Sequence, residues 1–419
     1  MRATLQSAND EASHRASGMK TYRVGGSVRD ELLGRPLADR DYVVVGATPD
    51  ELLALGFRPV GRDFPVFLHP ETHEEYALAR TERKTGRGHQ GFSFHTAPGV
   101  TLEADLARRD LTINAMARAD DGTLIDPFGG AKDLRAGVLR HVSPAFAEDP
   151  LRVLRVARFA ARFGFAVAPE TEAMMRAIAA GGELATLTAE RVWQELARAL
   201  MEATPSRFFA ALRRCGALAQ LFPEVDALFG LPRRDDRDAE IDAGVHCMRA
   251  LDYVDAAGEP LPVRYAVLAS NLRLPATGRA RPGDGVAQGV RRAAMLSRRL
   301  KAPADCRELA RLAARYGPAV HRAGELAPSA LLDLVLAADA LRRPERFEQL
   351  LRACAADRLS SPGSSRADYP PAARLAAALN VVRSVDAGAV VSGQPGARDI
   401  PRRVRAARLK ALRNWMRTL

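Results

Sequence analysis

Strand signals occur only in the first third of this 419-residue chain, and that restriction limits the folds it can adopt. Three runs rich in valine or aromatic residues follow one another before residue 82, namely "DYVVVG", "FPVFLHP" and "EEYALART". Beyond "GVLRHVSPAFAEDP", arginine, alanine and leucine recur at helical spacing almost to the C-terminus. We therefore predict the α+β fold class, with a small mixed α/β head followed by an all-α neck, body and tail.

Changes in composition divide the chain into five predicted segments. These are a polar N-terminal extension (1–20), the mixed α/β head (21–145), a helical neck (146–230), a helical body (231–355) and a helical tail (356–419). Stretches such as "PATGRARPGDG" and "RLSSPGSSRADYPP" have the proline, glycine and serine content of linkers.

The charge of the chain favours a polyanionic partner. The formal net charge is +12, and only five of the 62 basic residues are lysines. Codon bias in a GC-rich genome exchanges lysine for arginine but does not make the net charge positive. The four cysteines are far apart and lack C-x-x-C spacing, which argues against a zinc site or a disulfide framework. No apolar run is long enough to span a bilayer, so we expect a cytoplasmic protein without a membrane partner.

Two aspartates, Asp39 and Asp41, stand at the start of the strand "DYVVVG". Residues i and i+2 of a strand project from the same face, so the two carboxylates repel each other unless a cation lies between them. Mg²⁺ prefers such oxygen ligands and completes its shell with water and substrate phosphates. The D-x-D pattern is also common in acidic turns, and only its context favours the metal site.

A Gly-Gly turn precedes these aspartates in "TYRVGGSVRDELLG", between a predicted strand and a predicted helix. Glycine lets backbone N–H groups approach a phosphate closely, and a helix N-terminus carries partial positive charge. Arg29, one turn into the helix, could clamp a triphosphate or could pair with Asp30 or Glu31 on the surface.

In this order, the strand, "GGSVRD", the helix and "DRD" resemble the catalytic head of the polymerase β nucleotidyltransferase superfamily. Further motifs narrow the resemblance: "GRDFPVFLHP", "HEEYALARTERK", "RRDLTINAM", "DPFGG" and "EDPLRVLRVARFAARFGF". With them, the chain resembles the class II tRNA nucleotidyltransferases, or CCA-adding enzymes, densely over about residues 20–230.

This resemblance implies template-independent addition of C, C and A to the 3′ end of tRNA from CTP and ATP, with release of pyrophosphate and with Mg²⁺ as cofactor. DNA is not an expected partner. The implied residues are Asp39 and Asp41 for catalysis and magnesium, Gly26, Arg29 and Arg109 for the nucleotide, and Glu75 as a candidate third acidic group near the metal. The basic, glycine-rich stretch "RTERKTGRGHQGFSF" is expected to form a mobile loop beside this site.

Four arginines lie at spacings of three, three and four in "EDPLRVLRVARFAARFGF", on one face of a helix that Asp149 and Pro150 begin; they are Arg152, Arg155, Arg158 and Arg162. Like charges in such a row destabilise a solvated helix, which favours an anionic or base ligand.

Cytosine and adenine both present an amine beside a ring-nitrogen acceptor. Asp149 can accept from the amine and Arg152 can donate to the ring nitrogen, which would reject uracil and guanine. The resemblance likewise implies that this helix replaces a nucleic-acid template, with Arg155 and Arg158 as further nucleotide-binding residues.

Longer proteobacterial relatives of this family carry a second active site, an HD phosphohydrolase domain. His246, in "EIDAGVHCMRAL", matches the first metal ligand of such a domain. Where the His-Asp pair is expected, in "VRYAVLASNLRLP", this chain has Ser270 and Asn271, and the only later histidine is His321. We therefore expect a degenerate, HD-like helical body without phosphohydrolase activity, in which His246 is structural.

Other functions remain open at this stage. A bacterial poly(A) polymerase shares the head motifs and the "EDPLR" helix, and an A-adding-only tRNA nucleotidyltransferase is a further alternative. An RNA-binding protein with an inactive head would not need to retain Asp39, Asp41, Arg29 and Arg109. A glycosyltransferase with a D-x-D motif does not account for "EDPLRVLRVAR".

Overall fold

The computed structural model describes residues 18–37, 40–60, 66–84, 92–95, 97–234, 240–273, 284–360, 369–391 and 399–418. The chain forms two compact units. The N-terminal unit comprises residues 1–187 and 214–217, and the C-terminal unit comprises residues 188–213 and 218–419. The division falls inside the segment predicted as a neck, and the five-segment scheme stays a prediction.

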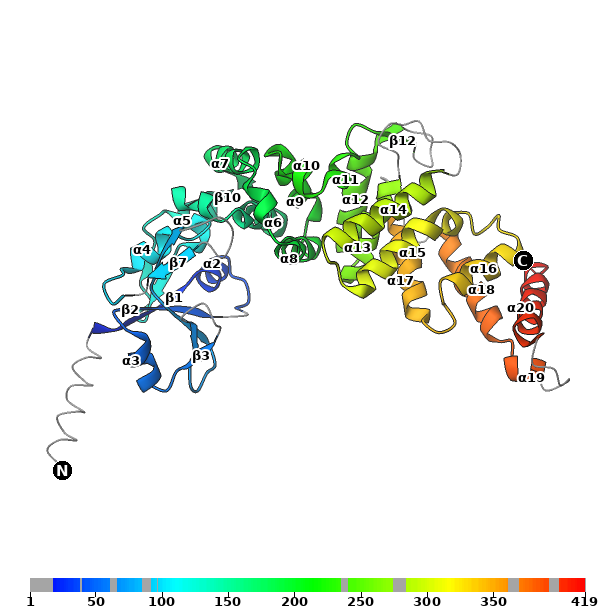
Figure 1. Cartoon of the computed structure of the whole chain (residues 1–419), viewed down its shortest axis with the longest axis horizontal. Coiled ribbons are helices and arrows are strands. Elements are labelled where there is room, and N and C mark those ends of the chain that lie inside the picture. Colours follow the sequence, from blue (N-terminus) through cyan, green and yellow to red (C-terminus); the bar gives the residue numbers. More distant parts are fainter. Residues whose placement is uncertain are drawn as a thin grey trace, which may run out of the picture. The chain divides into compact units, whose positions relative to one another are not determined.

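The largest sheet among the described residues has seven strands and lies in the N-terminal unit (Figure 1). Its order is β3-β4-β5-β2-β1-β8-β9. The strands are β1 (Lys20–Val24), β2 (Asp41–Val45), β3 (Arg58–Val60), β4 (Val66–Leu68), β5 (Glu75–Leu78), β8 (Ala117–Ala119) and β9 (Leu124–Ile125). Neighbouring strands are antiparallel except β2 and β5, which are parallel. The predicted strands and the mixed α/β head are thus confirmed.

Strand β2 forms because its valines can be buried on both faces of the sheet. Val43 packs on one face with a cluster that includes Val24, Leu106 and Ala117. Val44 packs on the other face with a cluster that includes Leu52, Phe67 and Leu78. By the same alternation, Asp41 shares the face of Val43.

Helices of the N-terminal unit follow the local signals. They are α2 (Gly26–Leu32), α3 (Pro49–Ala54), α4 (Leu102–Ala107), α5 (Gly130–Ala136), α6 (Leu151–Phe163) and α7 (Pro169–Ala180), with the 3₁₀ turns η2 (Thr112–Asn114), η3 (Pro144–Glu148) and η4 (Glu183–Thr186). Helix α3 begins with a capping box, in which Thr48 and Glu51 bond each other's backbone N–H.

The basic, glycine-rich stretch expected to be a loop contains two strands. Strands β6 (Thr81–Lys84) and β7 (Phe92–His95) pair as an antiparallel hairpin. Residues 85–91 between them lie outside the described residues, as does Asp39. Backbone pairing overrides the turn-forming composition of this stretch, because each cross-strand pair satisfies an N–H and a C=O group. A second short pair, β10 (Val138–Leu139) with β11 (Ala166–Val167), is parallel.

The motif "DPFGG" is explained by the close approach of α5 to η2. The Asp126 carboxylate accepts hydrogen bonds from the N–H groups of Gly130 (2.7 Å) and Ala131 (2.9 Å), so it caps α5. A Cβ atom at Gly130 would lie 2.1 Å from the Thr112 carbonyl oxygen and 2.9 Å from the Met116 Cγ. Only glycine fits at the first position of this helix.

We expect Gly130→Ala to lower the free energy of unfolding by about 2 kcal/mol or more, because the new methyl group displaces α5 from η2. Urea denaturation followed by circular dichroism measures this loss. Gly99→Ala is the matched control, since a Cβ atom there would contact nothing within 4 Å. Equal denaturation midpoints for the two variants would contradict this account of Gly130.

The described part of the C-terminal unit is largely helical (Figure 1). Its longer helices are α8 (Ala189–Leu200), α12 (Ala243–Ala256), α13 (Leu261–Ser270), α14 (Asp284–Arg299), α15 (Ala304–His321), α16 (Pro328–Ala337), α17 (Pro344–Leu359), α18 (Pro370–Arg383) and α20 (Ile400–Met416). Helix α13 is buried from Val263 to Ser270 and packs against α12, α14, α15 and α17. None of the described helices is both long and apolar enough to cross a membrane.

Two features depart from the all-α expectation: strand β11 lies in the segment predicted as a helical neck, and one hairpin lies in the predicted body. Strands β12 (Pro232–Arg234) and β13 (Glu240–Asp242) pair antiparallel just before α12. Asp242 ends the hairpin and caps α12, where its carboxylate accepts from the Val245 N–H at 2.9 Å. The hairpin is therefore fixed to the start of the helix that carries His246.

Candidate active site

Asp41 and Glu75 lie side by side at the beginnings of two parallel strands. The register of β2 and β5 pairs Asp41 with Glu75 and Tyr42 with Tyr76. The rings of Tyr42 and Tyr76 stack with centroids 4.5 Å apart, so side chains paired in this register share a face of the sheet. Both carboxylates are exposed. The structure thus brings Asp41 together with the glutamate that the sequence had singled out.

These two carboxylates fit part of a magnesium site. Exposed oxygen donors on neighbouring strands match the ligand preference of Mg²⁺ and leave room for water and phosphate. In the described residues, no group of three or more His, Cys, Asp or Glu side chains could hold a metal ion. The predicted partner Asp39 lies outside those residues, so the ligand set as a whole stays a prediction.

The glycine turn lies against Arg109. Gly25, which precedes α2, has a φ of 71°, and a Cβ atom there would lie only 2.9 Å from the Arg109 Nη1. Gly26 begins the helix. The Arg109 Nη2 contacts the Asp105 carboxylate at 3.1 Å, while its buried Nε has no hydrogen-bond partner among the described residues. A guanidinium and a glycine turn far apart in the sequence therefore meet, which concentrates donors for an anion.

Arg29 points into the protein. It is 4% exposed, and its Nε and Nη2 donate to the Asp30 carboxylate at 2.9 Å each. Its Nη1 donates to the Asn114 Oδ1 at 2.6 Å. Burial lowers the pKa of Arg29, and the charge of Asp30 partly offsets this shift. The pairing with Asp30 foreseen from the sequence exists, but it is buried; the role of Arg29 in nucleotide binding stays a prediction.

Asp110 is a functional candidate that sequence reasoning missed, although it follows Arg109 in "RRDLTINAM". It is 6% exposed, and its Oδ1 accepts from the Leu111 N–H (2.9 Å) and the Asn114 Nδ2 (3.0 Å). Its Oδ2 accepts from the Arg155 Nε at 2.7 Å. Burial alone would raise the pKa of Asp110, but the charge of Arg155 and the hydrogen bond from Asn114 hold it well below its usual range. Through Asn114, this carboxylate connects α6 with Arg29.

The arginine row of α6 has partners within the N-terminal unit. Arg155 bonds Asp110, and the Arg162 Nη2 lies 3.5 Å from the Asp30 Oδ2. Arg158 is buried, and its guanidinium lies 4.5 Å from the centroid of the Phe159 ring. The sequence predicted that the four arginines require an anionic ligand. The structure shows that carboxylates of other segments of the fold already contact two of them, Arg155 and Arg162.

Asp149 and Arg152, the predicted base-reading pair, both bond the backbone. The Asp149 Oδ1 accepts from the Leu151 N–H at 3.1 Å, at the start of α6. Arg152 is buried, and it donates to the carbonyl oxygens of Ala145 (2.8 Å) and Arg108 (2.7 Å). Their predicted contact with a nucleobase stays a prediction.

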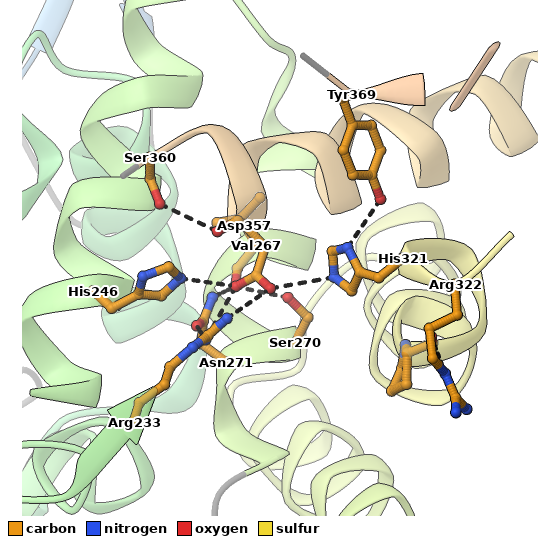
Figure 2. A network of polar contacts seen from close by, with 11 residues as sticks. Arg233, His246, Val267, Ser270, Asn271, His321, Arg322, Asp357, Ser360 and Tyr369 are labelled. Carbon is orange, nitrogen blue, oxygen red and sulfur yellow. Dashed lines mark hydrogen bonds and ion pairs between the residues drawn. The ribbon is translucent and has the colours of Figure 1, made fainter. Parts of the chain in front are cut away.

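A second polar cluster surrounds His246 in the C-terminal unit (Figure 2). The His246 ring is 3% exposed, and its Nε2 lies 3.1 Å from the Asp357 Oδ1. Ser270 and Asn271 both donate to the Val267 carbonyl oxygen, at 3.1 Å and 2.9 Å. Sequence reasoning identified the histidine but not Asp357, which is 111 residues away in the chain.

Two family models match the chain. The model of the poly A polymerase head domain matches residues 21–140, and that of the probable RNA and SrmB-binding site of polymerase A matches residues 164–229. The first covers the seven-stranded sheet and the glycine turn, and the second begins at the end of α6.

Curated relatives match over nearly the whole length. The multifunctional CCA protein of Chromobacterium violaceum is 59% identical, over 93% of this chain and 97% of the relative. That of Dechloromonas aromatica is 57% identical, over 95% of this chain and 98% of the relative.

Among solved structures, the CCA-adding enzyme of Bacillus stearothermophilus in complex with CTP has a TM-score of 0.65 and 22% identity, over 96% of this chain and 90% of that one. The CCA-adding enzyme of Thermotoga maritima complexed with tRNA has a TM-score of 0.63 and 22% identity, over 95% and 88%. The fold is thus that of the CCA-adding enzymes, and the chain belongs to the multifunctional CCA proteins, the class II CCA-adding tRNA nucleotidyltransferases.

Proposed function

We propose that this protein adds C, C and A to the 3′ end of tRNA without a nucleic-acid template, using CTP and ATP and releasing pyrophosphate, with Mg²⁺ as its cofactor. The similarity to the multifunctional CCA proteins over nearly the full length carries this proposal. Solved relatives of the same fold are described in complex with CTP, with ATP and with tRNA. We expect the reaction to take place in the cytoplasm.

In the proposed reaction, the tRNA 3′-hydroxyl attacks the α-phosphate of the bound nucleotide and pyrophosphate leaves. Asp41 and Asp39 would hold magnesium, with Glu75 beside them. Magnesium held by these carboxylates would supply Lewis-acid chemistry at the attacking and leaving oxygens. The side chain of Arg109 and the N–H groups of the turn at Gly26 bind the triphosphate, because they direct positive charge to one place. Fixed charges of this kind act on the transition state at no cost of reorganisation.

Base selection is assigned to α6. Asp149 would accept from the exocyclic amine of cytosine or adenine, and Arg152 would donate to the adjacent ring nitrogen. Both terminal nitrogens of Arg152 donate to backbone carbonyls, so reading a base requires Arg152 to exchange one of these partners for the nucleotide. Arg155 and Arg158, with Arg29, are the further nucleotide-binding residues of this proposal. A wrong base leaves buried polar groups unpaired and is rejected for that reason.

Incorporation on a tRNA that lacks its CCA end tests this function against its two alternatives. We expect CTP alone to extend the tRNA by C residues, and CTP with ATP to complete the CCA end; UTP and GTP should give no extension. A poly(A) polymerase would instead add a long tail from ATP alone. An A-adding-only enzyme would extend tRNA ending in CC but would not use CTP. Product length on a denaturing gel separates the three outcomes.

We further propose that the body has no HD phosphohydrolase activity. Support comes from Ser270 and Asn271, whose hydroxyl and amide side chains bond the Val267 carbonyl where a His-Asp pair would be needed. The purified protein, supplied with Ni²⁺, Mn²⁺ or Mg²⁺, should leave 2′,3′-cyclic AMP intact. Metal-dependent hydrolysis that disappears in a His246→Ala variant would refute the proposal.

A further inference from the structure

We propose that the guanidinium of Arg233 takes the place of a metal ion at the centre of the helical body. This inference deepens the proposed loss of the phosphohydrolase, on which it rests. It assigns to Arg233 the task of neutralising the buried carboxylate of Asp357 and of holding His246 and His321 around it (Figure 2).

Asp357 contacts the arginine and both histidines of this cluster. It lies on α17, is 3% exposed, and both of its carboxylate oxygens are shared between an arginine and a histidine. Oδ1 lies 3.2 Å from the Arg233 Nη1 and 3.1 Å from the His246 Nε2. Oδ2 lies 3.0 Å from the Arg233 Nη2 and 3.3 Å from the His321 Nε2. A buried carboxylate requires a compensating cation, and the two-pronged contact with Arg233 provides it.

The two imidazoles act as hydrogen-bond donors to Asp357. In both rings Nε2 faces a carboxylate oxygen, which only accepts, so Nε2 carries a proton. The Nδ1 of His321 lies 2.9 Å from the Tyr369 hydroxyl, which can donate to it. Each nitrogen that faces Asp357 is therefore a donor, whereas a metal would require its lone pair.

Arg233 reaches this position from the β12–β13 hairpin. Its Nη1 also donates to the Asn271 Oδ1 at 2.9 Å, so the guanidinium contacts one amide oxygen and both oxygens of the Asp357 carboxylate. These are the oxygen ligands that a hard cation would take. The backbone beside the hairpin is anchored, because the Ala243 N–H donates to the Leu231 carbonyl at 2.9 Å and Asp242 caps α12. An ordinary ion pair between Arg233 and Asp357 would not require two imidazoles and an amide oxygen to converge on the same place.

Restoring metal ligands with and without Arg233 tests the proposal. The Ser270→His/Asn271→Asp double variant reintroduces a His-Asp pair, and a triple variant adds Arg233→Ala. Calorimetric titration of the full-length proteins with Mn²⁺ should show one more binding site per chain in the triple variant than in the wild type. In the double variant this site should bind Mn²⁺ at least about tenfold more weakly, because the guanidinium of Arg233 still occupies the site and its positive charge repels the metal ion. Equal Mn²⁺ affinity in the two variants, or no added site in either, would overturn the role of Arg233.

Thermal unfolding provides a second test, independent of the introduced ligands. Arg233→Met should lower the Tm by roughly 10 °C, because the Asp357 carboxylate would stay buried without its cation. Arg233→Met combined with Asp357→Asn should recover part of this loss. Arg311→Ala is the control, since Arg311 is exposed on α15. An Arg233→Met variant as stable as this control would refute the proposal. Hydrolysis of cyclic nucleotides by the wild type, in contrast, would refute the loss of the phosphohydrolase itself.

Discussion

Replacing Asp41 by alanine is expected to abolish nucleotide incorporation while tRNA binding persists. Asp41 is the first residue of β2, the middle strand of the sheet, and it is exposed and paired in register with Glu75. Its carboxylate belongs to the predicted magnesium site. Loss of a metal ligand removes charge stabilisation from the transition state, and we expect incorporation to fall by about a thousandfold or more. Binding of tRNA depends on charge spread over many arginines and should change little.

Single-turnover incorporation of CMP and filter binding of labelled tRNA separate these two quantities. Asp39→Ala should behave like Asp41→Ala if the two residues share the metal. Glu103→Ala is the matched control, because it deletes an exposed carboxylate on α4 of the same unit. It should leave both the incorporation rate and the binding of tRNA unchanged. Incorporation near the wild-type rate in Asp41→Ala or Asp39→Ala would remove the basis for the proposed mechanism.

Asp110→Asn is expected to destabilise the N-terminal unit by about 2–3 kcal/mol and to slow incorporation. The substitution leaves the Arg155 guanidinium without its carboxylate and disturbs Asn114, which bonds both Asp110 and Arg29. Helix α6 would then lose its polar connection to Arg29 of α2. Urea denaturation at pH 7 measures the first effect, and single-turnover kinetics the second.

The destabilisation should depend on pH with a definite sign. The pKa of Asp110 is lowered in the folded protein, so its contribution to stability is fully present above the unfolded value of about 4. It declines as the pH falls below that value. The difference in unfolding free energy between wild type and Asp110→Asn should therefore be constant from about pH 7 to 5 and shrink below about pH 4. The exposed Asp120→Asn serves as control, and a difference that grows with acidity would contradict the assignment.

Local signals predicted the elements of the head well. The valine run of β2 and the glycine turn before α2 are features of a few adjacent residues, and the structure confirms the strand and the helix at these places. The spacing of the α6 arginines likewise predicted a helix, which runs from Leu151 to Phe163. Such patterns predict structure reliably because the burial and the backbone hydrogen bonds that fix a strand or a helix depend on residues close together in the sequence.

Partnerships between distant residues escaped prediction. Arg155 and Asp110 are 45 residues apart, and Arg233 and Asp357 are 124 residues apart. No local pattern distinguishes an arginine that meets a buried carboxylate from one that faces water or a nucleotide. For the same reason, the sequence foresaw the pairing of Arg29 with Asp30 but did not reveal that Arg29 is buried and bonds Asn114, which is 85 residues away. The hairpin within the basic, glycine-rich stretch was missed because cross-strand pairing depends on which segments meet.

The buried pair of Arg233 and Asp357 also limits how this protein can change over evolutionary time. Mutating Arg233 first leaves the Asp357 carboxylate buried without a cation. Acquiring a second carboxylate by Asn271→Asp first places two negative groups around one guanidinium. Each single step toward a metal site thus passes through a less stable protein, and both changes together avoid this only when a metal ion replaces the guanidinium. Once an arginine occupies such a centre, selection for stability alone keeps it there, and the metal site whose loss we propose would be difficult to regain.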